Sequence, residues 1–104
     1  MSETRPNIVI ILSDDQGYAD VRYHGYCDDV DTPHTDALAA SGVRLTDGYA
    51  SAYVCAPTQV GLLTGHYQQR FGFYKAPDSR VGLPTDEITV ADLLKDAGYN
   101  TSIF

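Results

Sequence analysis

The chain has 104 residues, a formal net charge of −7 at pH 7, and 43% hydrophobic and 20% charged residues. This length predicts one domain over residues 1–104, and the hydrophobic content is typical of a chain that folds around a core. A nucleic-acid partner is not expected, because binding to a phosphate backbone uses clustered Lys and Arg, which this acidic sequence lacks.

The longest apolar run is Ile8–Leu12, far shorter than the roughly 20 residues that span a bilayer. We therefore expect no membrane-spanning segment and no membrane partner. The amino terminus has Glu3 where a signal peptide would be basic. The chain is thus expected to be cytoplasmic or an exported protein without its signal, and the sequence leaves the localisation open.

Three segments are predicted to be strands. Residues 7–13 form a continuous run of mostly β-branched apolar residues, which is typical of a strand buried on both faces of a parallel sheet. Residues 43–49 alternate apolar and polar side chains, and residues 101–104 begin another strand-like run. The predicted fold class is α/β, with a mostly parallel sheet flanked by helices. Because the chain stops within the last run, we expect an incomplete domain.

Helices are predicted from capping residues and prolines, with irregular segments at 18–31 and 66–88. Thr89 with Asp92 forms a capping-box pattern. The predicted helices begin at Thr32-Pro33, Pro57 and Thr89 and end at Gly42, Gly65 and Gly98.

Asp14 and Asp15 follow the first predicted strand directly. Two adjacent carboxylates repel each other unless a cation or a shared proton compensates them, and calcium and magnesium prefer carboxylate oxygens. The carboxyl ends of strands in open α/β sheets collect ligands. We therefore predict a metal site here, with a solvated turn as the alternative interpretation.

Cys55 precedes a predicted helix start, where free N–H groups and the helix dipole favour an anionic thiolate or ligand. A nucleophile or an anion site is one interpretation, and a small buried apolar residue is the other. A disulfide between Cys27 and Cys55 is a minor possibility. The remaining candidates are expected to be surface residues: His24, His34, His66, Arg70 and Arg80.

Three stretches together resemble the sulfatase family of the alkaline-phosphatase superfamily. They are residues 6–18, which contain Ser13-Asp14-Asp15-Gln16-Gly17, residues 32–43, and residues 53–65, which contain Cys55-Ala56-Pro57-Thr58-Gln59. The resemblance covers nearly the whole chain, in the family's order.

The resemblance implies a covalent mechanism. In sulfatases the signature cysteine, here Cys55, is oxidised to formylglycine, whose hydrate attacks the sulfur of a sulfate ester held by calcium. By position, Asp14 and Asp15 would be metal ligands. The implied substrate is a sulfate ester, either a small molecule or a sulfated sugar.

The sequence departs from the family pattern. Gln59 stands where the Cys-x-Pro-x-Arg signature has arginine, so this position carries no charge. His66 stands where many relatives have arginine. The Gly-Lys-Trp-His stretch and the later Asp-Asn pair of the metal site are absent. We therefore expect this chain to be inactive by itself.

Alternatives remain open at this stage. A phosphatase or phosphonate hydrolase of the same superfamily would use the same arrangement. A non-catalytic metal-binding or interaction domain would use only the acidic pair. A receiver-like signalling module would make Asp47 the phosphoacceptor, although residues 18–31 lack the helix it needs. Exposed apolar surface is expected to favour self-association.

Overall fold

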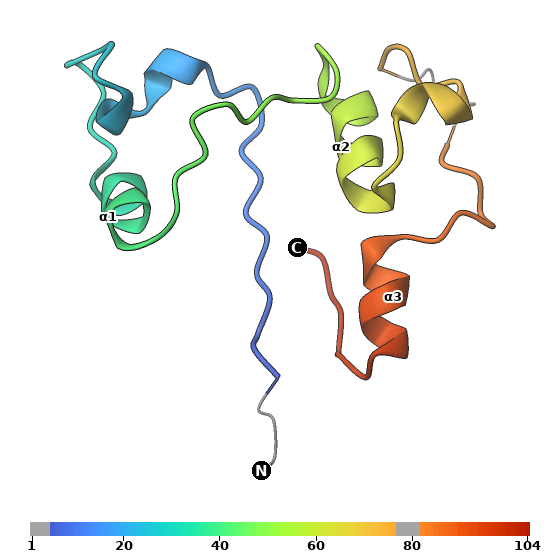
Figure 1. Cartoon of the computed structure of the whole chain (residues 1–104). Helices are drawn as coiled ribbons and strands as arrows, with labels where there is room; N and C mark the ends of the chain where they lie inside the picture. The colour runs from blue at the N-terminus through green and yellow to red at the C-terminus, as the bar shows by residue number, and fades with distance from the viewer. Residues whose placement is uncertain (1–4, 77–81) are drawn as a thin grey trace. The chain divides into compact units, whose positions relative to one another are not determined.

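The computed structural model describes residues 5–76 and 82–104. The chain divides into two compact units, Met1–Leu45 and Thr46–Phe104. Figure 1 shows the helices of each unit along the chain, and the two units are described separately below.

The first unit contains helix α1, Pro33–Ser41, and two short 3-10 helices, η1 at Tyr18–Asp20 and η2 at Arg22–His24. The prediction of α1 is confirmed, with Pro33 at its first position and Gly42 as the C-cap. The segment predicted as an irregular loop contains η1 and η2. These are single turns whose backbone hydrogen bonds are local, such as that from the Asp20 N–H to the Gly17 carbonyl at 3.0 Å.

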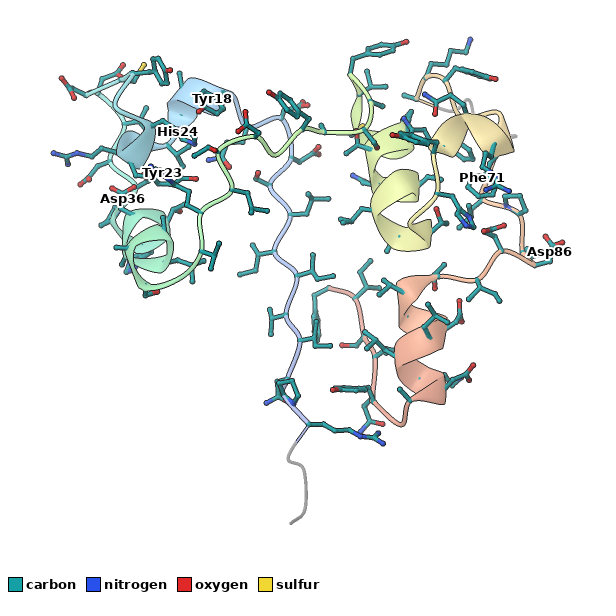
Figure 2. All side chains as sticks on the ribbon, viewed as in Figure 1. Tyr18, Tyr23, His24, Asp36, Phe71 and Asp86 are labelled. Carbon is teal, nitrogen blue, oxygen red and sulfur yellow. The ribbon has the colours of Figure 1, made fainter. Side chains whose placement is uncertain are left out.

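Side-chain hydrogen bonds join η2 to α1. The Asp36 carboxylate accepts from the Tyr23 N–H at 3.2 Å and from the Thr32 hydroxyl at 3.0 Å, and Figure 2 labels both Asp36 and Tyr23. The Thr32 hydroxyl oxygen accepts in turn from the Arg22 N–H at 3.0 Å. Thr32 was expected to cap α1, but its side chain makes no cap hydrogen bond, because it bonds to Arg22 and Asp36 instead.

The parallel sheet is not seen: the described residues contain no strand. Residues 7–13 run without helix or turn up to Ser13, and residues 43–49 and 101–104 also lack strand pairing. A strand exists only through hydrogen bonds to a neighbour, and none is formed by these segments. In the first segment exposure alternates: Ile8, Ile10 and Leu12 are 51–56% exposed, whereas Val9 and Ile11 are 79–86% exposed. This period of two is that of an extended backbone.

The second unit contains helix α2, Cys55–Thr64, the 3-10 helix η3, Gln68–Phe71, and helix α3, Val90–Asp96. Helix α2 begins two residues earlier than predicted, at Cys55 rather than Pro57. It ends as expected at Gly65, whose φ of 68° is the left-handed conformation that glycine adopts without strain.

The capping box of α3 is confirmed. The Thr89 N–H donates to the Asp92 carboxylate at 2.9 Å, and the Thr89 hydroxyl accepts from the Asp92 N–H at 3.4 Å. The helix ends at Asp96, with Ala97 as its C-cap, and Gly98 follows with φ 85°. These bonds explain why a helix of seven residues is formed, since short helices depend on their ends being satisfied.

Few side chains are buried in the part of the chain that the structure describes. The buried hydrophobic residues are Val21 in the first unit and Val60 and Phe73 in the second. One polar residue, Gln68, is fully buried beside them in the second unit. No helix among the described residues is long and apolar enough to cross a membrane.

Candidate functional site

The Asp14–Asp15 turn lies in the first unit, and both side chains are exposed. Asp15 has φ 52°, a left-handed conformation that Asp adopts more readily than most residues. Gly17, two residues after the turn, is the N-cap of η1, and its N–H donates to the Asp20 carboxylate at 2.7 Å. A Cβ at Gly17 would lie 2.8 Å from that carboxylate oxygen, so glycine permits the close approach.

The acidic pair is chemically suited to calcium, because carboxylate oxygens are its preferred ligands. Calcium takes six to eight oxygen ligands, however, and two carboxylates supply only part of that shell. Among the described residues, no three His, Cys, Asp or Glu side chains are grouped to hold a metal ion. Asp14 and Asp15 therefore fit calcium in ligand type, as part of a site.

Cys55 lies in the second unit as the first residue of α2, which confirms its expected place at a helix amino terminus. Its thiol is exposed and free, so the interpretation as a buried apolar residue is wrong. Val54, the N-cap residue, provides no side-chain hydrogen bond to the helix. The N–H groups of the first turn thus remain available to an anionic group beside Cys55.

Gln59 is also exposed and lies four residues after Cys55 on α2. Residues at this spacing are neighbours on one helix face, about 5–6 Å apart at Cβ. The structure therefore places Cys55 and Gln59 side by side on α2. The amide of Gln59 can donate a hydrogen bond there but supplies no positive charge.

The disulfide between Cys27 and Cys55 is not formed, and both thiols are free. Partial burial, followed by the carboxylate of Asp29, raises the pKa of the Cys27 thiol above its ordinary value. Cys27 therefore stays protonated and is a poor nucleophile at neutral pH. Of the two cysteines, Cys55 is the one that lies at a helix amino terminus.

The histidines do not form a common site. His24 lies next to Tyr18, and both are labelled in Figure 2. Their ring centroids are 3.9 Å apart, and His24 is half-buried rather than exposed. His34 is exposed on α1. His66 follows Gly65 and its Nδ1 lies 2.9 Å from the Glu87 carboxylate.

The two arginines singled out in the sequence, Arg70 and Arg80, are not placed in the candidate site by the structure. Arg70 is exposed at the end of η3, as expected of a surface charge, and Arg80 lies outside the described residues.

Two residues that the sequence analysis did not single out, Thr58 and Gln68, form hydrogen bonds to the segment Ser51–Val54, which precedes Cys55. The Thr58 hydroxyl lies 3.0 Å from the Val54 carbonyl and 3.1 Å from that of Ala52. The Gln68 side-chain amide donates to the Ser51 carbonyl at 2.7 Å. Thr58 could have been identified from the sequence, because a Thr hydroxyl in a helix often donates to the carbonyl four residues earlier. No local signal identifies Gln68, whose partner is 17 residues away.

Comparisons with known proteins agree on one family. The family model described as Sulfatase matches residues 6–104. Arylsulfatase A from Bos taurus and from Homo sapiens are each 45% identical over 101 residues, which cover 94% of this chain and 20% of those proteins. Human steryl-sulfatase is 40% identical over 108 residues, covering 96% of this chain and 18% of that protein. No solved structure matched.

The chain thus spans about a fifth of the length of the curated relatives that it matches. The match includes both the acidic turn at Asp14–Asp15 and the segment around Cys55, each within residues 6–104. The family has an α/β fold, and its members named here are sulfatases. The chain belongs to the sulfatase family.

Proposed function

We propose that this chain is a segment of a sulfuric ester hydrolase in which Cys55 is the precursor of a formylglycine nucleophile. The observation that carries the proposal is the place of Cys55: an exposed, free thiol at the first position of α2. An exposed side chain is open to a modifying enzyme and to a substrate. The helix end favours the negative charge of a sulfate group.

The residues of the second unit would act on the sulfate group in two ways. The N–H groups in the first turn of α2, which Val54 does not cap, would donate to a sulfate oxygen. Gln59, one turn along the same face, would add a neutral hydrogen-bond donor. The loss of arginine at this position predicts weaker binding of sulfate than in relatives that carry the full signature.

In the first unit, Asp14 and Asp15 would be ligands of calcium. Bound calcium would supply positive charge that neutralises the sulfate group. The substrate class supported by the relatives' names is a sulfate ester, such as an aryl or steryl sulfate. A phosphate or phosphonate ester remains the alternative within the superfamily.

We also propose that the 104 residues alone do not turn over a sulfate ester. They contain no Gly-Lys-Trp-His stretch, so they lack the lysine and histidine expected to bind sulfate and to serve the leaving group. They supply only two carboxylates toward a calcium shell. Metal binding by the acidic turn is then the activity expected of the isolated chain.

The family's parallel sheet is proposed to include residues 7–13. These residues are extended, strongly apolar and largely exposed, as expected of a strand without a neighbour. The same exposure favours self-association of the isolated chain, because an unpaired apolar edge accepts another chain. A sharp monomeric species in gel filtration at high concentration would contradict this expectation.

The test of the proposed function is the chemistry of Cys55. The chain is co-expressed with a formylglycine-forming enzyme, and the peptides that contain Cys55 and Cys27 are examined by mass spectrometry. We expect an aldehyde at Cys55 and an unmodified thiol at Cys27, which serves as the control within the molecule. The variant Gln59→Arg restores the signature and should raise the modified fraction. An unmodified Cys55 thiol in both proteins would refute the proposal.

A further inference from the structure

We propose that Gln68 is a positioning residue for Cys55. It acts through the segment Ser51–Val54, which leads into α2, and not through contact with a reacting atom. This inference rests on the proposed function of Cys55, since fixing the direction of that side chain matters only if chemistry takes place there.

The position of Gln68 in the second unit is unusual for a polar side chain. It is fully buried, with 0% of its surface exposed. Its backbone is fixed at the start of η3, where its carbonyl accepts from the Phe73 N–H at 3.1 Å. From this point its side chain reaches the Ser51 carbonyl at 2.7 Å. A buried residue of the core is thereby linked directly to the segment before Cys55.

The orientation of the Gln68 amide is set by its surroundings. If the amide were turned over, its oxygen would face the carbonyl oxygen of Ser51 and the two would repel. In the observed orientation the Oε1 atom is buried and has no hydrogen-bond partner among the described residues. A buried acceptor that has no partner is unfavourable, because it gives up its hydrogen bonds to water. The Gln68 side chain therefore donates to the Ser51 carbonyl although its own Oε1 is left without a hydrogen bond.

Gly61 on α2 makes room for this arrangement. A Cβ at Gly61 would lie 2.7 Å from the Ser51 hydroxyl oxygen and 3.1 Å from Gln68 Oε1. Both distances are shorter than ordinary van der Waals contacts, so a larger residue would push the two side chains away from α2. The segment, the buried glutamine and the helix are thus in close contact at one place.

The other contacts of the segment do not replace Gln68. The single proton of the Thr58 hydroxyl is shared between the carbonyls of Val54 and Ala52, and Tyr53 donates from its own side chain to the Tyr74 carbonyl at 3.1 Å. Within residues 5–76 and 82–104, the hydrogen bond to the Ser51 carbonyl comes from Gln68. Loss of this bond should release the upstream end of the segment and widen the range of directions open to Cys55.

The test measures backbone order in the full 104-residue chain by NMR relaxation. In the variant Gln68→Leu, we expect the order parameters of Ala52 and Tyr53 to fall from about 0.85 to below about 0.6, while those within α2 and α3 are unchanged. The control is Val60→Ala, which truncates a buried apolar side chain of α2 and leaves the hydrogen bond from Gln68 to the Ser51 carbonyl in place. It should leave the order parameters of the segment unchanged.

A second variant separates positioning from general stability. In Gln68→Glu, an ionised carboxylate cannot donate to the Ser51 carbonyl, whereas the protonated acid can. We expect disorder of the segment at neutral pH and its reversal on acidification, with the unsubstituted chain at the same pH as the reference. Because both states are measured in one protein, this comparison holds even if Gln68→Leu fails to fold.

The outcomes can be told apart. Unchanged order in the Gln68 variants, or an equal loss of order in Val60→Ala, would overturn the role of Gln68. Absence of formylglycine at Cys55 would instead refute the proposed function, and it would leave the measured effect of Gln68 on the segment intact.

Discussion

Replacement of the acidic pair by asparagine tests the metal site of the first unit. The double variant Asp14→Asn/Asp15→Asn removes two negative charges and keeps the shape of both side chains. Asn also tolerates the left-handed backbone, φ 52°, that Asp15 adopts. Any change in the response to calcium then reflects the loss of carboxylates and not a distorted turn.

The expected rise in Tm with calcium can be calculated if calcium binds the folded chain and not the unfolded one. A partial site of this kind is expected to bind calcium with a Kd of about 1 mM, the weak end of protein calcium sites. At about 10 mM calcium, binding then stabilises the fold by about 1.4 kcal/mol. For a chain of this length, that corresponds to a rise in Tm of about 6–11 °C.

The assay is thermal unfolding followed by circular dichroism, with and without calcium. The matched control is Asp28→Asn/Asp29→Asn, which makes the same change to the net charge of −7 in an exposed loop of the same unit. We expect the control to keep the calcium-dependent rise in Tm and the Asp14/Asp15 variant to lose it. An equal rise in both would show that calcium only screens the acidic surface, and the metal role would be wrong.

Three further substitutions test the local structure. Thr89→Val removes the cap hydroxyl of α3 and should lower the hydrogen-exchange protection of its amides about fivefold, as expected for the loss of about 1 kcal/mol at an N-cap; unchanged protection would contradict the capping box. Because hydrogen bonds from Thr89 lower the pKa of Asp92 below its ordinary 3.8, protection in the unsubstituted chain should persist above about pH 4 and decline as the pH falls through the lowered value. The variant loses the hydroxyl but keeps the backbone N–H that donates to the Asp92 carboxylate, so it should show a weaker pH dependence. Phe73→Ala should destabilise the second unit by about 3–5 kcal/mol in a denaturant titration, since this side chain is 5% exposed; a loss below 1 kcal/mol would argue against its burial. Gly17→Ala should break the hydrogen bond from the amide of residue 17 to the Asp20 carboxylate, which would be seen as an upfield shift of that amide proton. An unshifted proton would contradict the close approach of residue 17 to Asp20.

The helices were predictable because their signals are local. Proline at the first position of α1, the Thr89–Asp92 pair and the glycines at 65 and 98 each satisfy or end a helix within a few residues. The early start of α2 was missed, since Cys55 and Ala56 carry no start signal of their own and Pro57 does. The place of Cys55 at a helix amino terminus was nevertheless foreseen.

The strands and Gln68 depend on distant partners, and for that reason the sequence predicted them poorly or not at all. The apolar run at 7–13 shows what kind of surface these residues would bury, but a strand also requires a neighbour, and its residues stay exposed here. Gln68 is polar and sits in a segment predicted to be irregular. Its burial results from the approach of Ser51 and Gly61, which no short-range pattern reveals.

The proposed role of Cys55 is that of precursor to the nucleophile of a sulfatase. The most direct test is mass spectrometry of the Cys55 peptide from protein purified from its native host, with the Cys27 peptide of the same sample as the reference. We expect formylglycine at Cys55 and a thiol at Cys27. A thiol at both positions would contradict the claim, and binding at the Asp14–Asp15 turn would remain the function to pursue.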